Sequence, residues 1–162
     1  MLLLTTGGTI DKIYFDDQSE YEVGDSVIPA LLRESRVTLD YRVVSLMRKD
    51  SLELTDEDRS AIREACEEAE EVRIVITHGT DTMATTAEAL RGIAGKTIVL
   101  TGSLAPARFR ETDAIFNIGF ALAVAQAKPE GVFIAMNGRI FEAGHVRKNL
   151  ETRRFEATDG AS

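Results

Sequence analysis

The chain has 162 residues, 44% of them hydrophobic, which fits one globular domain over residues 1–162. Its formal net charge of −8 argues against a nucleic-acid partner, because binding to a phosphate backbone needs clustered Lys and Arg. A single cysteine excludes an internal disulfide and favours a reducing, cytoplasmic compartment.

The amino terminus, MLLLTTGG, has no basic segment and too short an apolar run for a signal peptide. No apolar run approaches the roughly 18 residues that a membrane span requires. We therefore expect no association with a membrane.

Short β-type runs alternate with helical patterns along the chain. Four of the five expected strands are continuous apolar runs, which is typical of parallel strands covered on both faces. The alternation predicts right-handed βαβ units and an α/β fold with a doubly wound, mostly parallel sheet, a three-layer flavodoxin or Rossmann type. The expected strands are 2–6, 39–46, 72–77, 96–102 and 131–137, and the expected helices are 26–34, 55–70, 82–91 and 111–127.

The helix expected over 55–70 begins with a capping signal and carries the only cysteine. Thr55 can cap the helix, and Asp58 at the third helical position can accept a hydrogen bond from the Thr55 N–H in return. Cys66 shares the apolar stripe of Ile62 and Ala69, which predicts core packing rather than a reactive thiol. The acidic residues of this segment form a solvated face.

Unusual polar clusters fall in the loops that follow the expected strands. In doubly wound sheets, ligands bind beyond the carboxyl ends of the strands, where the strand order reverses. The loops to consider are therefore 7–25, 47–54, 77–81, 102–110 and 138–150.

The first cluster is TTGGTI, residues 5–10, which spans the end of the first expected strand and the start of the loop after it. Its two glycines allow a tight turn and a close approach of backbone to ligand, and they place Thr9 just past the strand. Neither the G-x-G-x-x-G fingerprint nor a phosphate-binding loop is present, which counts against a nucleotide site. A plain glycine turn with a capping threonine is the alternative. Residues 11–25 are long and polar, as in a lid that excludes water.

The second cluster is THGTDTM, between an expected strand and an expected helix. Free backbone N–H groups at such a turn can hold an anionic group. Thr80 or Asp81 can instead be a simple helix cap, although capping does not account for four polar residues in a row. For His78, a hydrogen-bonded structural role is preferred over proton transfer.

The third cluster, GHVRKNLETRRF, contains several cations, of which Lys148 is one. By default a lysine is a solvated surface group. An amine close to a hydroxyl and a carboxylate, however, can take the proton of the hydroxyl while the carboxylate orients it, a variant of triad chemistry. Lys148 would serve in this way if it reaches Thr80 and Asp81.

Together, TTGGTI, THGTDTM, VLTGSLAPAR followed by TDAIFNIGFALA, and GHVRKN resemble the bacterial-type L-asparaginase family. The resemblance covers nearly the whole chain and corresponds to the family's larger, amino-terminal domain. The two threonine motifs, in this order and near these separations, are its most specific part.

The resemblance implies a catalytic role for five residues. Thr9 matches the threonine that attacks the side-chain amide, and Tyr21, in YEVG, matches the loop tyrosine that closes over the substrate. Thr80, Asp81 and Lys148 match the family's Thr-Lys-Asp arrangement. A covalent acyl-enzyme on Thr9, released by water, is the mechanism that we expect, with backbone N–H groups of 80–82 stabilising the oxyanion.

The resemblance also implies substrate-binding residues and the absence of a cofactor. Asp50 and Ser51, in KDSLEL, match the pair that binds the α-carboxylate and α-amino groups, and Asp81 contributes to gripping the ammonium. Family enzymes need no metal or organic cofactor. Where some members carry a substrate-binding glutamine, this chain has Leu52, which is expected to alter selectivity.

Family members usually continue into a second, smaller domain, and this chain ends about where the connection would begin. In the full-length family, active sites form between neighbouring subunits, and the second domain contributes polar groups to the site of the partner. A surface that such a domain would cover favours self-association. We therefore expect a homodimer or a higher homo-oligomer.

Three functions remain as hypotheses. The favoured one is an amidohydrolase acting on L-asparagine or a similar small amide. The second is a non-catalytic module that binds aspartate or asparagine, and the third is a subunit associated with an amidotransferase. The hydroxyl–lysine pair favours catalysis over binding alone, and the acidic charge disfavours the third.

Overall fold

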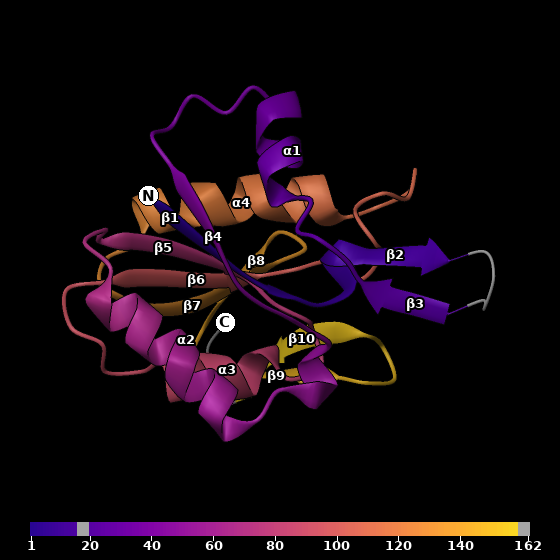
Figure 1. Cartoon of the computed structure of the whole chain (residues 1–162). Helices are drawn as coiled ribbons and strands as arrows, with labels where there is room; N and C mark the ends of the chain where they lie inside the picture. Colours follow the sequence, from indigo (N-terminus) through magenta and orange to yellow (C-terminus); the bar gives the residue numbers. More distant parts are fainter. Residues whose placement is uncertain (16–19, 159–162) are drawn as a thin grey trace.

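The computed structural model describes residues 1–15 and 20–158; the side chains of 14, 15, 20 and 21 also lie outside the description. A six-stranded sheet forms its centre, in the order β4-β1-β5-β6-β7-β8 (Figure 1). All neighbours pair in parallel except β7 and β8. The strands are β1 (Leu2–Gly7), β4 (Arg42–Lys49), β5 (Arg73–Thr77), β6 (Thr97–Thr101), β7 (Gly131–Met136) and β8 (Arg139–Glu142).

The four inner strands are the four continuous apolar runs of the sequence. β1 is buried at every position, and Leu3, Val75 and Val99 of neighbouring strands are fully inaccessible. β4, at the edge, has only half-buried and exposed positions. The structure thus confirms the predicted doubly wound, mostly parallel sheet.

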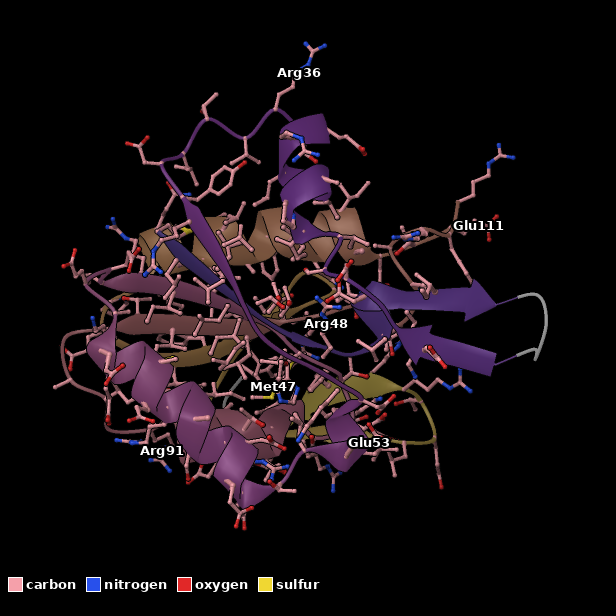
Figure 2. The ribbon with its side chains drawn as sticks, viewed as in Figure 1. Arg36, Met47, Arg48, Glu53, Arg91 and Glu111 are labelled. Atoms are coloured by element: carbon pink, nitrogen blue, oxygen red, sulfur yellow. The ribbon has the colours of Figure 1, made fainter. Side chains whose placement is uncertain are left out.

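Helices cover both faces of this sheet and complete three layers (Figure 1). α2 (Asp56–Glu68) and α3 (Met83–Ala89) pack on one face. α1 (Ile28–Glu34) and α4 (Ala114–Ala127) pack on the other. Figure 2 shows side chains filling the space between the layers. Among the helices of residues 1–15 and 20–158, none combines the length and the apolar composition of a membrane-spanning segment.

The predicted cap and core of α2 are confirmed. The Thr55 hydroxyl accepts a hydrogen bond from the Asp58 N–H, and the Asp58 carboxylate accepts one from the Thr55 N–H at 2.9 Å. Cys66 is fully buried in the core, and burial raises the pKa of its thiol to about 12. The thiol is therefore a packing group, as its position in the apolar stripe predicted.

Two segments expected as loops contain short antiparallel strands. Residues 138–150 form β8 and β9 (Val146–Asn149), and β9 pairs with β10 (Arg154–Ala157). The expected lid contains the hairpin of β2 (Lys12–Phe15) and β3 (Glu20–Val23), which projects from the sheet in Figure 1. These four-residue strands are too short and polar for an apolar pattern to reveal them.

The second expected strand, 39–46, is shifted along the chain. It is β4, and pairing with β1 fixes its bounds, from Leu2 opposite Arg42 to Gly7 opposite Lys49. The shift matters because it carries the strand up to the polar residues at 50 and 51. The order of the main strands reverses between β1 and β5, so the carboxyl ends of these neighbours form the switch point.

Candidate active site

The ends of β1, β4 and β5 converge at the switch point. Beyond β1, the Gly8 N–H donates to the Lys49 carbonyl at the end of β4, at 3.0 Å. On its other side, Gly8 lies against Gly79 in the loop that follows β5. Close backbone contacts at Gly8 thus join three segments that are far apart in the sequence.

Gly8 adopts φ 86° and ψ −173°, a conformation open almost only to glycine. A Cβ at this position would lie 2.4 Å from the Gly79 nitrogen. We expect Gly8→Ala to lower the free energy of unfolding by about 3–5 kcal/mol, because strain and a backbone clash add. Urea denaturation measures the loss.

Gly92→Ala is the matched control for that substitution. Gly92 also has a positive φ, 81°, but nothing lies within 4 Å of a Cβ built there. Its replacement should cost only about 1 kcal/mol, the strain alone. Equal losses in the two variants would show that the contact between Gly8 and Gly79 is unimportant.

The polar turn after β5 meets a lysine from the far end of the chain. The Lys148 Nζ donates to Thr80 Oγ1 at 2.7 Å and to Asp81 Oδ1 at 2.5 Å. Thr80 is buried, the Lys148 side chain is 10% exposed, and that of Asp81 is 38% exposed. Lys148 of the third cluster therefore reaches both Thr80 and Asp81 of the second, which is the contact that a catalytic role for the lysine needs.

Hairpin β9–β10 positions Lys148. Phe155 pairs directly with Lys148 across the two strands, and it packs against Phe141 with ring centroids 6.3 Å apart. Val146 and Phe155 are both buried in the core. These apolar anchors hold the strand, so that the lysine leaves it in a fixed direction.

Asp50 and Ser51 follow β4 and border the same turn. The Thr82 hydroxyl donates to the Ser51 carbonyl at 2.7 Å, and a Cβ on Gly79 would lie 2.5 Å from Ser51 Oγ. Ser51 is 1% exposed, and its hydroxyl has no hydrogen-bond partner within the described residues. A buried, unsatisfied hydroxyl in such a place is available to a ligand.

The Asp50 carboxylate forms an ion pair with Lys12, Oδ2 to Nζ at 2.7 Å. Burial by itself would raise the pKa of this carboxyl. The hydrogen bonds from Lys12 and from the Leu52 N–H outweigh burial, so the pKa lies below its ordinary value. Asp50 is therefore held as an anion facing the base of hairpin β2–β3.

Thr9 and Tyr21 belong to the same hairpin region. Thr9 is half-buried at the start of a 3-10 turn, Thr9–Asp11, and its hydroxyl makes no hydrogen bond within the described part of the chain. The backbone of Tyr21 lies in β3, opposite Tyr14. Its side chain is outside the described residues, so its closing role stays a prediction.

Sequence reasoning assigned no role to three residues that organise this site. Lys12 pairs with Asp50, and Thr82 ties the turn after β5 to Ser51. Asp11 is buried, and its Oδ1 accepts a hydrogen bond from the Val27 N–H at 2.8 Å. Lys12 and Asp11 follow Thr9 closely in sequence, but no pattern indicates their partners.

Ion pairs and backbone contacts fix the base of hairpin β2–β3. The Gly24 N–H donates to the Asp11 carbonyl at 2.9 Å. Arg48 of β4 reaches Asp25 with Nη1 2.6 Å from Oδ1, and it lies beside the hairpin in Figure 2. The hairpin thus starts from a held base next to Thr9.

Burial raises the pKa of the Asp11 carboxyl from 3.8 to about 6, despite hydrogen bonds from Val27 and Ser26. The folded protein therefore binds this proton more tightly than the unfolded chain. Its contribution to stability is full below pH 3.8 and is lost as the pH rises through 6. The loss is about 3 kcal/mol, at about 1.4 kcal/mol per pH unit.

We accordingly expect Asp11→Asn to gain stability relative to the wild type between pH 4 and pH 7. Asparagine keeps an acceptor for the Val27 N–H but has no charge to bury. Urea denaturation of both proteins at several pH values measures the difference. A difference that stays constant with pH would contradict the assignment.

His78 has the structural role that was preferred for it. It is fully buried, with Nδ1 2.6 Å from the Gly79 carbonyl oxygen and Nε2 2.8 Å from Thr86 Oγ1. Burial lowers the pKa of the imidazole to about 4, so the ring is neutral near pH 7. A neutral ring with both nitrogens engaged holds the turn in place.

Within residues 1–15 and 20–158, no three His, Cys, Asp or Glu side chains are gathered closely enough to hold a metal ion. The groups gathered around the switch point are the hydroxyls of Thr9 and Thr80, the amine of Lys148 and the carboxylates of Asp50 and Asp81. Taken together, the fold and this cluster define a doubly wound α/β protein with a hydroxyl–lysine–carboxylate site at the switch point of its sheet.

The family model for the amino-terminal domain of asparaginase matches residues 1–160. The chain belongs to the asparaginase family, and it matches the amino-terminal domain. The family resemblance of its motifs is thereby confirmed.

Among relatives, the glutaminase-asparaginase of Acinetobacter glutaminasificans is 42% identical over 95 residues, 54% of this chain and 29% of that protein. The L-asparaginase of Thermococcus kodakarensis is 33% identical over 156 residues, 91% and 47% of the two chains. A probable periplasmic L-asparaginase of Haemophilus influenzae is 31% identical over 163 residues, which cover 93% of this chain and 46% of that protein. The chain spans less than half the length of each.

Solved structures agree with the fold. The thermostable L-asparaginase of Thermococcus kodakarensis superposes with a TM-score of 0.80 at 29% identity, over 96% of this chain and 50% of that one. A probable cytoplasmic L-asparaginase of Campylobacter jejuni superposes with a TM-score of 0.74 at 28% sequence identity. The superposition covers 91% of this chain and 47% of that one.

Proposed function

We propose that the protein is an amidohydrolase that converts L-asparagine, or a similar small amide, to the acid and ammonia. One observation carries the proposal: the Lys148 amine contacts both the Thr80 hydroxyl and the Asp81 carboxylate at the switch point of the sheet. A site that only bound a ligand would not need an amine against a buried hydroxyl. Membership of the asparaginase family supports the same reaction.

In the proposed mechanism, the Thr9 oxygen attacks the amide carbon, and its proton passes to the leaving nitrogen. The tetrahedral intermediate collapses, the C–N bond breaks, and ammonia leaves an acyl ester on Thr9. Water attacks this ester and gives one proton to the Thr80–Lys148 pair. As the bond between the acyl carbon and the Thr9 oxygen breaks, the pair returns that proton to the Thr9 oxygen and the acid leaves. Backbone N–H groups at 80–82 would stabilise the oxyanion.

The remaining polar groups would bind the substrate. Asp81 is more than a third exposed and engages Lys148 through Oδ1, so Oδ2 would accept the substrate ammonium. The unsatisfied Ser51 hydroxyl and the adjacent Asp50 would bind the α-carboxylate and α-amino groups. Tyr21 on the hairpin would close over the substrate.

Ammonia release from L-asparagine and from L-glutamine tests the proposal with the wild-type chain. Release that is saturable in substrate is the expected result. Binding of L-asparagine or L-aspartate without release would overturn it and favour a ligand-binding module.

We also propose that the protein is cytoplasmic and forms a homodimer or a higher homo-oligomer. Its small-molecule partner would be the amide substrate. Two large neighbouring apolar side chains near the start of α4 are exposed, Ile115 at 58% and Phe116 at 59%, and a second copy of the chain could cover them. The Campylobacter neighbour is named cytoplasmic and the Haemophilus relative periplasmic, so cell fractionation decides the compartment. A strictly monomeric species in light scattering would contradict the oligomer.

A further inference from the structure

A cavity of about 420 Å³ lies apart from the candidate active site. Loops at the carboxyl ends of β6 and β7, strand β8 and the tip of hairpin β9–β10 enclose it. None of the residues proposed for catalysis or substrate binding lines it. The lining residues are Leu104, Met136, Asn137, Arg139, Phe141, Thr152, Arg153, Arg154 and Phe155.

The wall of this cavity is strongly positive in a protein of net charge −8. It contains three arginines, Arg139, Arg153 and Arg154, and no carboxylate. Within the described part of the chain these arginines form no ion pair, whereas arginines such as Arg42 and Arg147 face a carboxylate. Three arginines that have no ion pair among the described residues and that line one hollow favour an anion.

The carboxylate that touches the lining residues directly is already used. Asp113 accepts hydrogen bonds from the Leu104 N–H at 2.9 Å and from Asn137 Nδ2 at 3.0 Å. It also accepts one from Asn117 Nδ2 at 2.9 Å. The Asp113 carboxylate is thus hydrogen-bonded to amide N–H groups and, among the described residues, forms no ion pair with the three arginines.

The floor of the cavity is apolar. Phe141 and Phe155 are buried beneath it, and Leu104 is 42% exposed at its side. The Arg139 guanidinium lies 5.2 Å from the centroid of the Phe141 ring. A cation beside an apolar floor suits a molecule with a charged end and an apolar body.

Arg153 has a left-handed backbone conformation, which is unfavourable for a residue with a side chain such as arginine. Its φ is 53°, at the end of the turn between β9 and β10, where glycine or asparagine is the usual residue. An arginine held there at a conformational cost is consistent with a role for its side chain.

We propose that this cavity binds a small organic anion, a carboxylate with an apolar body. The guanidinium groups of Arg139, Arg153 and Arg154 hold the carboxylate, and the apolar body rests on Leu104, Phe141 and Phe155. The proposal does not rest on the amidohydrolase reaction, although Phe141 and Phe155 also anchor the hairpin that carries Lys148.

Benzoate, acetate, inorganic phosphate and benzyl alcohol are suitable probes, followed by NMR titration of backbone amides. Benzoate should bind saturably, at least about tenfold more tightly than acetate or phosphate, with shifts confined to the lining residues. Benzyl alcohol should not bind. Phosphate as tight as benzoate, or shifts spread over the whole surface, would overturn the proposal.

Two variants and two controls complete the test. Arg139→Gln and Arg153→Gly should each weaken benzoate about fivefold or more, and the glycine should leave the melting temperature unchanged or higher because φ is positive. Arg33→Gln, an exposed arginine on α1, and Lys148→Met should leave the affinity unchanged. Equal weakening by Arg33→Gln, or loss of binding in Lys148→Met, would refute the assignment.

Discussion

Lys148→Met and Thr80→Val are each expected to lower the rate of ammonia release at least about a thousandfold. The amine and the hydroxyl are 2.7 Å apart, and proton transfer requires both. Because they act as one unit, the double variant should be little slower than either single variant. Initial rates with L-asparagine, on proteins shown by circular dichroism to be folded, measure the effect.

Two controls separate a missing proton acceptor from a missing charge. Arg147→Met removes a cation from the neighbouring position, where the side chain is 69% exposed and pairs with Glu156 at 3.6 Å, so activity should be unchanged. Lys148→Arg keeps a positive charge near Asp81 but cannot release its proton. Substantial activity in Lys148→Arg would mean that the lysine acts only as a charge.

Thr9→Ala is expected to abolish turnover, with a loss of about 10⁴-fold or more, because it removes the proposed nucleophile. The substitution should be structurally mild, since the Thr9 hydroxyl makes no hydrogen bond within the described residues. Mass spectrometry of substrate-soaked protein should show an acyl adduct on a peptide containing Thr9 in the wild type and none in the variant.

Thr9→Ser is the matched control, because it keeps a hydroxyl at the same position. It should retain part of the activity and form the same adduct. Full turnover in a folded Thr9→Ala protein would refute the assignment of the nucleophile, and an adduct on Thr80 would transfer the role to that residue.

The sheet and its covering helices could be predicted because their signals are local. Runs such as residues 72–77 are apolar at consecutive positions, and burial on both faces of a parallel strand is what such a run requires. The start of α2 was equally readable, since Thr55 and Asp58 bond to each other within one turn. The polar clusters could be placed after strands for the same reason.

The two hairpins were not predicted because their strand pairing depends on contacts with residues outside the hairpins. Strand β9 carries Val-Arg-Lys-Asn, which has no strand pattern of its own. Strand β9 forms because Val146 and Phe155 pack in the core with Phe141. The pairing of β10 with β9 then completes the hairpin. Tertiary packing overrides local preference in such short segments.

The sequence by itself determined which residue types stand at the ends of which strands, because hydrophobic burial along each segment is a local property. The family resemblance implied that Lys148 meets Thr80, 68 positions away, but the residues alone left this open and gave no sign that Lys12 pairs with Asp50; the tertiary structure decided both contacts. Contacts of this kind depend on strand order and register, which bring segments together in space. Spacing along the chain carries no record of them.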